Sequence, residues 1–310
     1  MGNKYGFRSG VITAKNMKVN EQLTVKGAQV VGTLPLTTGD IWYVDYNRAS
    51  DGDGTSMDSA FTSITSALAK AGNYDTILVA EAAIMTCPTA GWTITQTGLK
   101  IIGANLHEGT QSNAIKKIAG TTPIFTIKAD RVEIANLCLS QRTAYPCIQI
   151  GDTIGQAYYQ IYIHNCNLEG QTGTYGITPG GSLGVKSGAS PVNMVVENNY
   201  FSGFTVAAIV ADGDRCSYVG NTIKVNDDGI GIWYLSGAGD RPGSVIQANT
   251  FRGLSASTTK AILFDATPTA GDIILANNYL CGTWNVTITD VAGGCMNYVT
   301  DASGGALINC

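Results

Sequence analysis

The sequence is poor in charge, in histidine and in long apolar runs. Only 14% of its 310 residues are charged, and its two histidines are His107 and His164. The formal net charge is -4 and no basic run occurs, so there is no electrostatic basis for binding nucleic acid. No stretch approaches the roughly 18 consecutive apolar residues of a membrane-spanning helix. We therefore expect neither nucleic acid nor membrane as a partner.

The first ten residues lack the apolar core of a secretion signal, and Gly6 stands where N-myristoylation requires Ser or Thr. We therefore expect synthesis and folding in a cytoplasm. None of the eight cysteines forms a Cys-x-x-Cys pair, which argues against a zinc site. We expect free thiols that act as small buried apolar side chains, and we expect no cofactor.

Glycine, by contrast, is abundant at 38 residues, and the hydrophobic fraction is 44%. This composition excludes disorder and suits a β-rich fold with frequent tight corners. Residues 1–38 carry no periodic core, and we interpret them as an N-terminal arm or attachment segment, with a flexible tail as the alternative. The arm contains scattered apolar residues: Val11, Ile12, Leu23, Val25, Val30 and Val31. Residues 39–310 form the second region.

The strongest signal is a repeat in this second region. Six segments each end in an anchor residue, and the positions four and two before the anchor are mostly apolar, as a strand with one buried face requires. The anchors are spaced by 29, 33, 22, 28 and 29 residues. This repeat predicts a solenoid of stacked coils. The anchors are Asn136, Asn165, Asn198, Gly220, Ala248 and Asn277.

Two further columns accompany the anchors. One residue after the anchor, Asn recurs in four successive coils, where stacked side chains could hydrogen bond up the solenoid and tolerate left-handed backbone angles. We predict a structural ladder of Asn199, Asn221, Asn249 and Asn278. Three residues after each anchor an apolar residue recurs, which predicts a core stack of Leu139, Leu168, Phe201, Ile223, Phe251 and Leu280. Residues 99–105 look like one more coil in weaker register.

Residues 42–80 contain a separate pattern. A strand-like Trp-Tyr-Val-Asp is followed by a glycine-rich loop over 50–56, apolar residues at helical spacing up to Ala71, and a strand over 75–80. We expect Asp58 to be the N-cap of the helix and Gly72-Asn73 to end it. The pattern resembles the beginning of pectate-lyase-like right-handed parallel β-helices, in which the helix caps the first coil. The resemblance implies an all-β solenoid with a short capping helix and says little about function.

Carbohydrate enzymes on such a fold usually need paired acids, or calcium with a basic residue. The catalytic candidates are two Asp pairs, Asp212 with Asp214 and Asp227 with Asp228. The second pair resembles that of polygalacturonase-like hydrolases, but the Gly-His-Gly and Arg-x-Lys motifs of that family are absent, and its setting is also good turn chemistry. Asp51 and Asp53 are metal candidates that equally suit a solvated loop.

Other polar and aromatic residues are less informative. We expect His164 to be a surface histidine that faces outward. A set of aromatic residues suits either a lateral sugar-binding strip or contacts between subunits. These residues are Tyr158, Tyr159, Tyr162, Trp233 and Tyr234.

The fold does not settle the function, and three classes remain. They are a structural virion protein of a bacteriophage (capsid decoration, fibre or small spike), a polysaccharide-degrading tailspike-type glycosidase or lyase, and a surface adhesin or glycan-binding module. The incomplete set of acids and bases counts against an enzyme. We expect a virion-surface protein that resembles phage proteins forming homotrimers, contacts other virion proteins through its arm, and is a candidate to contact a host surface glycan.

Overall fold

The structure is a computed structural model, and the chain divides into two units, Met1–Leu36 and Thr37–Cys310. In the first unit, β1 (Thr24–Val25) pairs antiparallel with β2 (Ala28–Gln29). The arm residues Val11, Ile12, Leu23, Val30 and Val31 lie outside the described residues. The structure describes residues 24–25, 28–29, 39–80, 84–104, 114–152, 156–170, 175–179, 190–211, 213–225, 229–234, 243–254, 260–264, 273–283, 286–288, 296–300 and 306–309.

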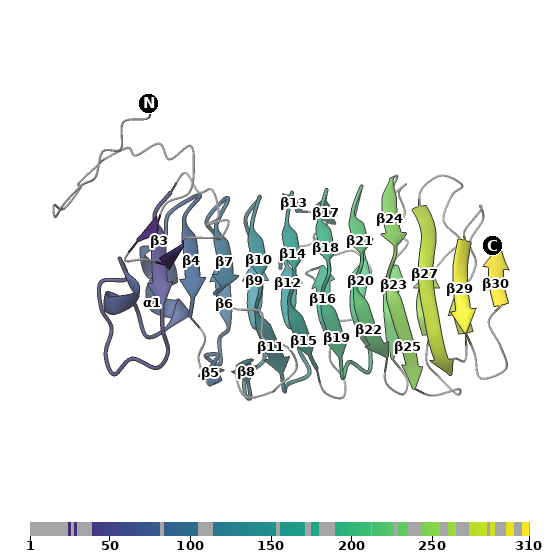
Figure 1. The fold of residues 1–310 in the computed structure, drawn as a ribbon, viewed down its shortest axis with the longest axis horizontal. Coiled ribbons are helices and arrows are strands. Elements are labelled where there is room, and N and C mark those ends of the chain that lie inside the picture. The colour runs from purple at the N-terminus through teal and green to yellow at the C-terminus, as the bar shows by residue number, and fades with distance from the viewer. Residues whose placement is uncertain are drawn as a thin grey trace, which may run out of the picture. The chain divides into compact units, whose positions relative to one another are not determined.

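The second unit is a right-handed parallel β-helix, as the repeat and the opening motif predicted (Figure 1). Its large sheet contains two strands from most coils, and neighbouring coils pair in parallel. The strands of the large sheet are β3 (Ile41–Val44), β4 (Thr76–Val79), β5 (Ile84–Thr86), β7 (Lys100–Gly103), β8 (Ala114–Lys117), β10 (Glu133–Ala135), β11 (Cys138–Gln141), β14 (Tyr162–His164), β15 (Asn167–Glu169), β18 (Val195–Glu197), β19 (Tyr200–Ser202), β21 (Ser217–Val219), β22 (Thr222–Val225), β24 (Ser244–Gln247), β25 (Thr250–Leu254), β27 (Ile273–Thr283), β29 (Met296–Thr300) and β30 (Ala306–Asn309).

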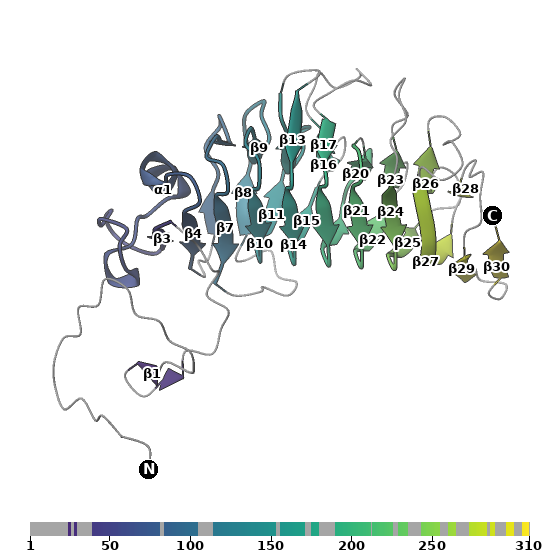
Figure 2. The same cartoon turned by 90° about the horizontal axis from the view of Figure 1, so that it is seen from above.

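A second sheet closes the other side of the coils (Figure 2). Its strands also pair in parallel, one per coil. They are β6 (Trp92–Ile94), β9 (Phe125–Ile127), β12 (Ile148–Ile150), β16 (Tyr175–Pro179), β20 (Ala207–Ala211), β23 (Ile230–Tyr234), β26 (Lys260–Phe264) and β28 (Val286–Ile288). A separate pair consists of β13 (Ala157–Tyr159) and β17 (Ser190–Val192). Residues 99–105, expected in weaker register, contain β7, which pairs residue for residue with both β4 and β10.

The core is a column of apolar side chains between the two sheets. The six residues of the core stack are all buried, and the pairing register places each directly above its counterpart in the next coil. Phe201 and Phe251 are completely buried. Because burying such a side chain contributes about 1.5–3 kcal/mol, the repeated position is a main source of stability. The stack consists of Leu139, Leu168, Phe201, Ile223, Phe251 and Leu280.

The asparagines that follow the anchors form a continuous hydrogen-bonded ladder inside the turn. Each side-chain amide donates to the side-chain oxygen of the next Asn, at 3.1, 3.0 and 3.0 Å. The same oxygens accept the preceding backbone N–H at 3.0, 3.0 and 3.1 Å. The ladder therefore satisfies polar groups that the tight turn would otherwise bury without partners. Its members are Asn199, Asn221, Asn249 and Asn278, all buried.

The left-handed residue of each turn is the anchor and not the ladder asparagine. All six anchors have φ between 52° and 66°. Asn and Gly adopt this conformation readily, which explains five of the six. Ala248, at φ 55°, has neither advantage and is a strained position.

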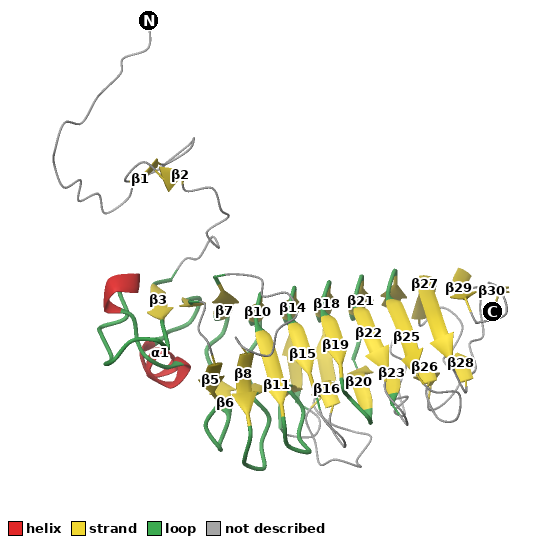
Figure 3. Cartoon of the chain, turned by 60° about the horizontal axis from the view of Figure 1, so that its bottom comes forward, coloured by secondary structure: helices red, strands yellow, loops and turns green. Residues whose placement is uncertain are grey.

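The N-terminal end of the solenoid carries two short helices (Figure 3). η1 (Met57–Ser59) is capped by Ser56, and α1 (Ile64–Lys70) is capped by Ser63, whose hydroxyl accepts the N–H of Ser66 at 3.1 Å. The prediction that Asp58 caps a single helix is wrong, because the chain becomes extended at Ala60 and Phe61 before α1 begins. Within the described residues, no helix is long and apolar enough to cross a membrane.

The same segment covers the outer edge of the first strand, β3. Tyr43 donates its N–H to Gly54 and accepts the N–H of Phe61, both at 2.9 Å, and Asp45 donates to Phe61 at 2.8 Å. The ring of Phe61 packs onto Gly54, where an added Cβ would lie 2.1 Å from it. Edge strands with free N–H and C=O groups are aggregation sites, and this loop occupies those groups on β3.

Candidate functional site on the outer face of the large sheet

A cluster of ionisable side chains lies on the outer face of the large sheet. Alternation along the strands turns Ile134 and Ile163 into the core and their neighbours outward. The register then stacks Lys100, Glu133 and Tyr162 in one column, and it pairs His164 with Glu197 in the adjacent column. These five residues, from β7, β10, β14 and β18, are called the outer-face network.

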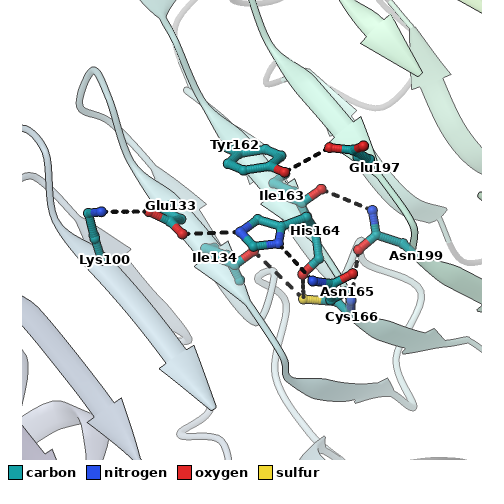
Figure 4. A network of polar contacts seen from close by, with 10 residues as sticks. All are labelled: Lys100, Glu133, Ile134, Tyr162, Ile163, His164, Asn165, Cys166, Glu197 and Asn199. Atoms are coloured by element: carbon teal, nitrogen blue, oxygen red, sulfur yellow. Dashed lines mark hydrogen bonds and ion pairs between the residues drawn. The ribbon is translucent and has the colours of Figure 1, made fainter. Parts of the chain in front are cut away.

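The residues of the outer-face network are joined by polar contacts from coil to coil (Figure 4). Glu133 forms an ion pair with Lys100 at 3.0 Å and contacts Nε2 of His164 at 3.1 Å. Tyr162 donates its hydroxyl to Glu197 at 2.7 Å, and its ring stacks on the imidazole at a centroid distance of 3.9 Å. The amide nitrogen of Asn165 lies 3.1 Å from Nδ1 of His164.

These contacts fix the imidazole in one tautomer. The carboxylate of Glu133 can only accept, so the proton of neutral His164 belongs on Nε2, and Nδ1 then accepts from Asn165. The N–H of the next residue, Cys166, donates to Asn199 at 2.9 Å. The outer-face network is therefore attached to the first rung of the asparagine ladder.

The electrostatics of the cluster favour a charged, hydrogen-bonded Glu133. The hydrogen bond from His164 and then the contact with Lys100 hold the pKa of Glu133 below its usual value, although burial opposes them. Burial, with the hydrogen bond to Glu197, raises the pKa of Tyr162 to about 12. A carboxyl group with a lowered pKa is ionised at neutral pH and is a poor general acid. This arrangement ties coils together and does not prepare Glu133 to donate a proton.

Of the four predicted catalytic residues, the structure describes only Asp214. Asp214 forms an isolated bridge with Val192 in the turn that leads to β21, away from the outer-face network. Asp212, Asp227 and Asp228 lie outside the described residues. The structure therefore gives no geometry for either predicted acid pair.

The metal candidates Asp51 and Asp53 are occupied by hydrogen bonds within their own loop. Asp51 accepts from Thr62 and from the Ser66 hydroxyl, and Asp53 accepts from Thr55 and Ser59. The bond from the Ser59 hydroxyl is the main cause that lowers the pKa of Asp53 to about 2. Across the part of the chain that the structure describes, no three His, Cys, Asp or Glu residues are grouped to hold a metal ion.

The second sheet differs from the large one in its chemistry. None of its described strands contains Asp, Glu or His. Val210 and Ala207 are buried and pack with Trp233 and Ile230, while threonines and Gln149 occupy other positions. The described strands of this sheet therefore carry no carboxylate and no imidazole group.

The five aromatic residues proposed as a strip do not share one face. Tyr158 and Tyr234 are buried, Trp233 packs on the second sheet, and Tyr162 belongs to the outer-face network. Only Tyr159 is well exposed, at 46%. A sugar-binding strip made of these five side chains is excluded, because the coils wrap them around different sides.

A second column of left-handed residues runs along the turn that leads into the large sheet. Seven successive coils have φ between 52° and 79° at this position. Unlike the anchors, four of the seven residues carry bulky side chains, and the left-handed conformation costs such residues about 1–2 kcal/mol. No sequence pattern indicates this column, because its residues share neither type nor polarity. They are Tyr74, Gly98, Arg131, Gln160, Asn193, Arg215 and Gly243.

Four of the six described cysteines are buried. The six described cysteines are free thiols, as the sequence predicted, whereas Cys295 and Cys310 lie outside the described residues. Burial raises the pKa of Cys87 and of Cys166 to about 12. Thiols in such surroundings are inert.

Comparison with known proteins bears on the fold alone. The sequence matches no protein-family model and no curated protein. A solved pectin methylesterase in complex with a hexasaccharide has a TM-score of 0.55 to this chain, with 16% identity over 88% of this chain and 86% of that chain. The two share a fold. Pectin methylesterase PemA from Erwinia chrysanthemi has a TM-score of 0.49 to this chain, with 14% identity over 87% of this chain and 85% of that chain. A pectate lyase has a TM-score of 0.42, with 14% identity over 83% of this chain and 79% of that chain.

Sequence reasoning missed the outer-face network. His164 was expected to be a surface histidine, but it is half-buried between Glu133 and Tyr162. The signal was available in principle, since Glu133, His164 and Glu197 occupy outward positions of three successive predicted strands. Their contacts depend on the stacking of coils separated by 29 and 33 residues, which only the register fixes.

Proposed function

We propose that the chain is a structural protein of a bacteriophage particle, whose β-helical body is exposed on the virion surface. In this proposal, residues 1–38 attach the body to other virion proteins, and the body has no catalytic role.

The observation that carries this proposal is the state of the carboxylates. The described strands of the second sheet carry none. On the large sheet, Glu133 bonds Lys100 and His164, Glu197 accepts from Tyr162, and Glu169 pairs with Arg142 at 3.2 Å. A glycosidase needs two carboxyl groups across the scissile bond, one of them with a raised pKa. The lowered pKa of Glu133 is the opposite of that requirement.

The division of the chain supports an attachment role for the arm. The described residues of the first unit form one pair of two-residue strands, and a hairpin of that size is too small to be stable alone in water. Such a segment gains order by adding strands to a partner, where backbone hydrogen bonds supply much of the affinity. We therefore expect the arm to acquire its final structure on the virion.

We further propose that the body assembles as a homotrimer, because closed rotational symmetry is the usual outcome for soluble homo-oligomers and the resemblance to phage β-helix proteins implies three chains. Sedimentation of the purified full chain at micromolar concentrations should give three times the monomer mass. A monomer at every concentration, together with monomers in assembled particles, would contradict this part of the proposal.

Deletion of residues 1–38 tests the attachment role. The truncated body should keep its β-type circular dichroism spectrum and thermal melt, and incorporation into particles should fall to background. The matched control is the full chain with Asn73→Ala, an exposed change in the body that should leave incorporation unchanged. Unchanged incorporation of the truncated protein would refute the proposed role of the arm.

An activity assay tests the non-catalytic role separately. The full chain should release no reducing ends or unsaturated products from host polysaccharide. If it does cleave, and the double variant Asp227→Asn, Asp228→Asn does not, the chain is a tailspike-type enzyme instead.

A further inference from the structure

We propose that the ridge formed by Tyr74, Arg131, Tyr159 and Gln160 is a binding site for a linear polysaccharide that lies along the solenoid axis. These four residues are called the turn ridge. The inference goes beyond the structural role proposed above, because it adds recognition of a ligand and needs no catalysis.

The first observation is where bulky side chains accept backbone strain. In the anchor column, left-handed positions hold Asn, Gly or Ala, which are small. In the second column of left-handed residues, Tyr74, Arg131 and Gln160 adopt φ of 65°, 59° and 58°. Glycine would adopt these angles without strain, as Gly98 does in the coil between Tyr74 and Arg131. Backbone strain at several neighbouring positions indicates that these side chains have a role that depends on their contacts.

The second observation is that these side chains hold one another across coils. Arg131 donates from Nε to Oε1 of Gln160 at 3.1 Å and from Nη1 to the hydroxyl of Tyr74 at 3.3 Å. Gly98 makes this possible, because a Cβ there would lie 2.3 Å from the Tyr74 ring. The guanidinium is therefore held in one orientation on the surface, and it has five N–H donors, of which these contacts use two.

The third observation is the exposure of two tyrosine rings: Tyr74 contacts this guanidinium through its hydroxyl, and Tyr159 is joined to Arg131 through the backbone. Tyr74 is 40% exposed and Tyr159 is 46% exposed. Tyr159 is fixed through its backbone, since its N–H donates to Asp130 at 2.9 Å and its carbonyl accepts the N–H of Arg131 at 2.8 Å. Aromatic faces next to oriented hydrogen-bond donors match a sugar, which offers apolar C–H faces and hydroxyl acceptors.

The shape of the turn ridge favours a thin polymer over a protein partner. A stable protein interface buries about 800 Å² per partner around an apolar centre. The turn ridge has only four side chains, of which two are tyrosines, and the left-handed positions along it recur once per coil at about 4.8 Å. A linear polysaccharide also presents equivalent groups at regular short steps, so it can contact successive coils.

The test is retention of the labelled full chain on an array of linear neutral and acidic bacterial and plant polysaccharides. Wild type should be retained by at least one of them. Arg131→Ala should weaken that retention about tenfold or more, because it removes charged hydrogen bonds to the ligand. Tyr74→Phe keeps the ring but loses the hydrogen bond that orients Arg131, so its retention should lie between those of wild type and Arg131→Ala.

Arg215→Ala is the matched control. Arg215 is an exposed arginine in the same left-handed column, at φ 52°, but it belongs to a coil beyond the two exposed tyrosines. Its retention should stay within about twofold of wild type, and circular dichroism should show that all variants fold. Retention of wild type by no polysaccharide, or equal losses for Arg131→Ala and Arg215→Ala, would overturn the proposal.

A further outcome separates this proposal from the structural role. Arg131→Ala should leave the sedimentation coefficient and incorporation into particles unchanged. If it alters either while polysaccharide retention stays at the wild-type level, the turn ridge is a protein contact and the proposed ligand is wrong. The attachment role of residues 1–38 would still stand in that case.

Discussion

The asparagine ladder gives the sharpest prediction about stability, at its interior member Asn221. The oxygen of Asn221 accepts both the backbone N–H and the side-chain amide of Asn199, at 3.0 and 3.1 Å. Its own amide donates to Val196 at 2.9 Å and to Asn249 at 3.0 Å. All of these groups lie in a turn that is closed to solvent.

Substitution Asn221→Ala removes the acceptor of two buried donors on Asn199. Each buried donor without a partner costs about 1–3 kcal/mol, so we expect a loss of about 2–6 kcal/mol in the free energy of unfolding. Typical domains are stable by about 5–15 kcal/mol, so the loss should be large. Urea unfolding followed by circular dichroism measures it.

Two controls separate the ladder from a general effect of mutation. Asn73→Ala removes an exposed asparagine that accepts one hydrogen bond, from Thr97 at 2.9 Å, and should cost less than about 1 kcal/mol. Asn221→Asp keeps the volume but sets a carboxylate oxygen against Val196 and Asn249, and should also destabilise strongly. A change below about 1 kcal/mol in Asn221→Ala would refute the reasoning.

Three further predictions concern the core, the anchors and pH. Phe201→Ala should lower the free energy of unfolding by about 3–5 kcal/mol, and a wild-type thermal melt would contradict the core stack. Ala248→Asn should raise it by about 1 kcal/mol in urea melts, because Asn tolerates the left-handed angle, whereas a loss would exclude strain there. Folding lowers the pKa of Glu133, so its contribution to the free energy of unfolding is present above the ordinary pKa of Glu and is lost as pH falls through the pKa in the folded state. Glu133→Gln should therefore flatten the decline of stability at acid pH. Parallel curves of stability against pH for wild type and variant would argue against the ion pair.

The sequence was informative wherever one coil repeats the chemistry of the next. Anchor spacing fixed the register, so the positions of Leu168 and Phe201 could be read from the chain without any coordinates. The same phase placed Asn199 above Asn221. Local capping was less predictable, because Ser56, Asp58 and Ser63 are all good N-cap residues and the break at Phe61 depends on its bridge to β3.

The contacts on the surface of the solenoid could not be predicted in the same way. The bond from Arg131 to Tyr74 joins residues 57 positions apart and skips a coil. It exists because Gly98 leaves room, a condition that no local pattern reveals. His164 and Glu133 likewise meet only after the coils have stacked.

The covered edge of β3 also decides how copies of this body can grow into larger objects. Parallel coils are interchangeable, so an open first strand would accept the last strand of another copy and begin an unlimited fibre. Here the N-terminal edge is occupied by Gly54 and Phe61, and at the other end β30 pairs antiparallel with β29 and so breaks the parallel repeat. Head-to-tail elongation is therefore blocked at the first strand, and stacking of copies end to end cannot continue into a fibre from that end.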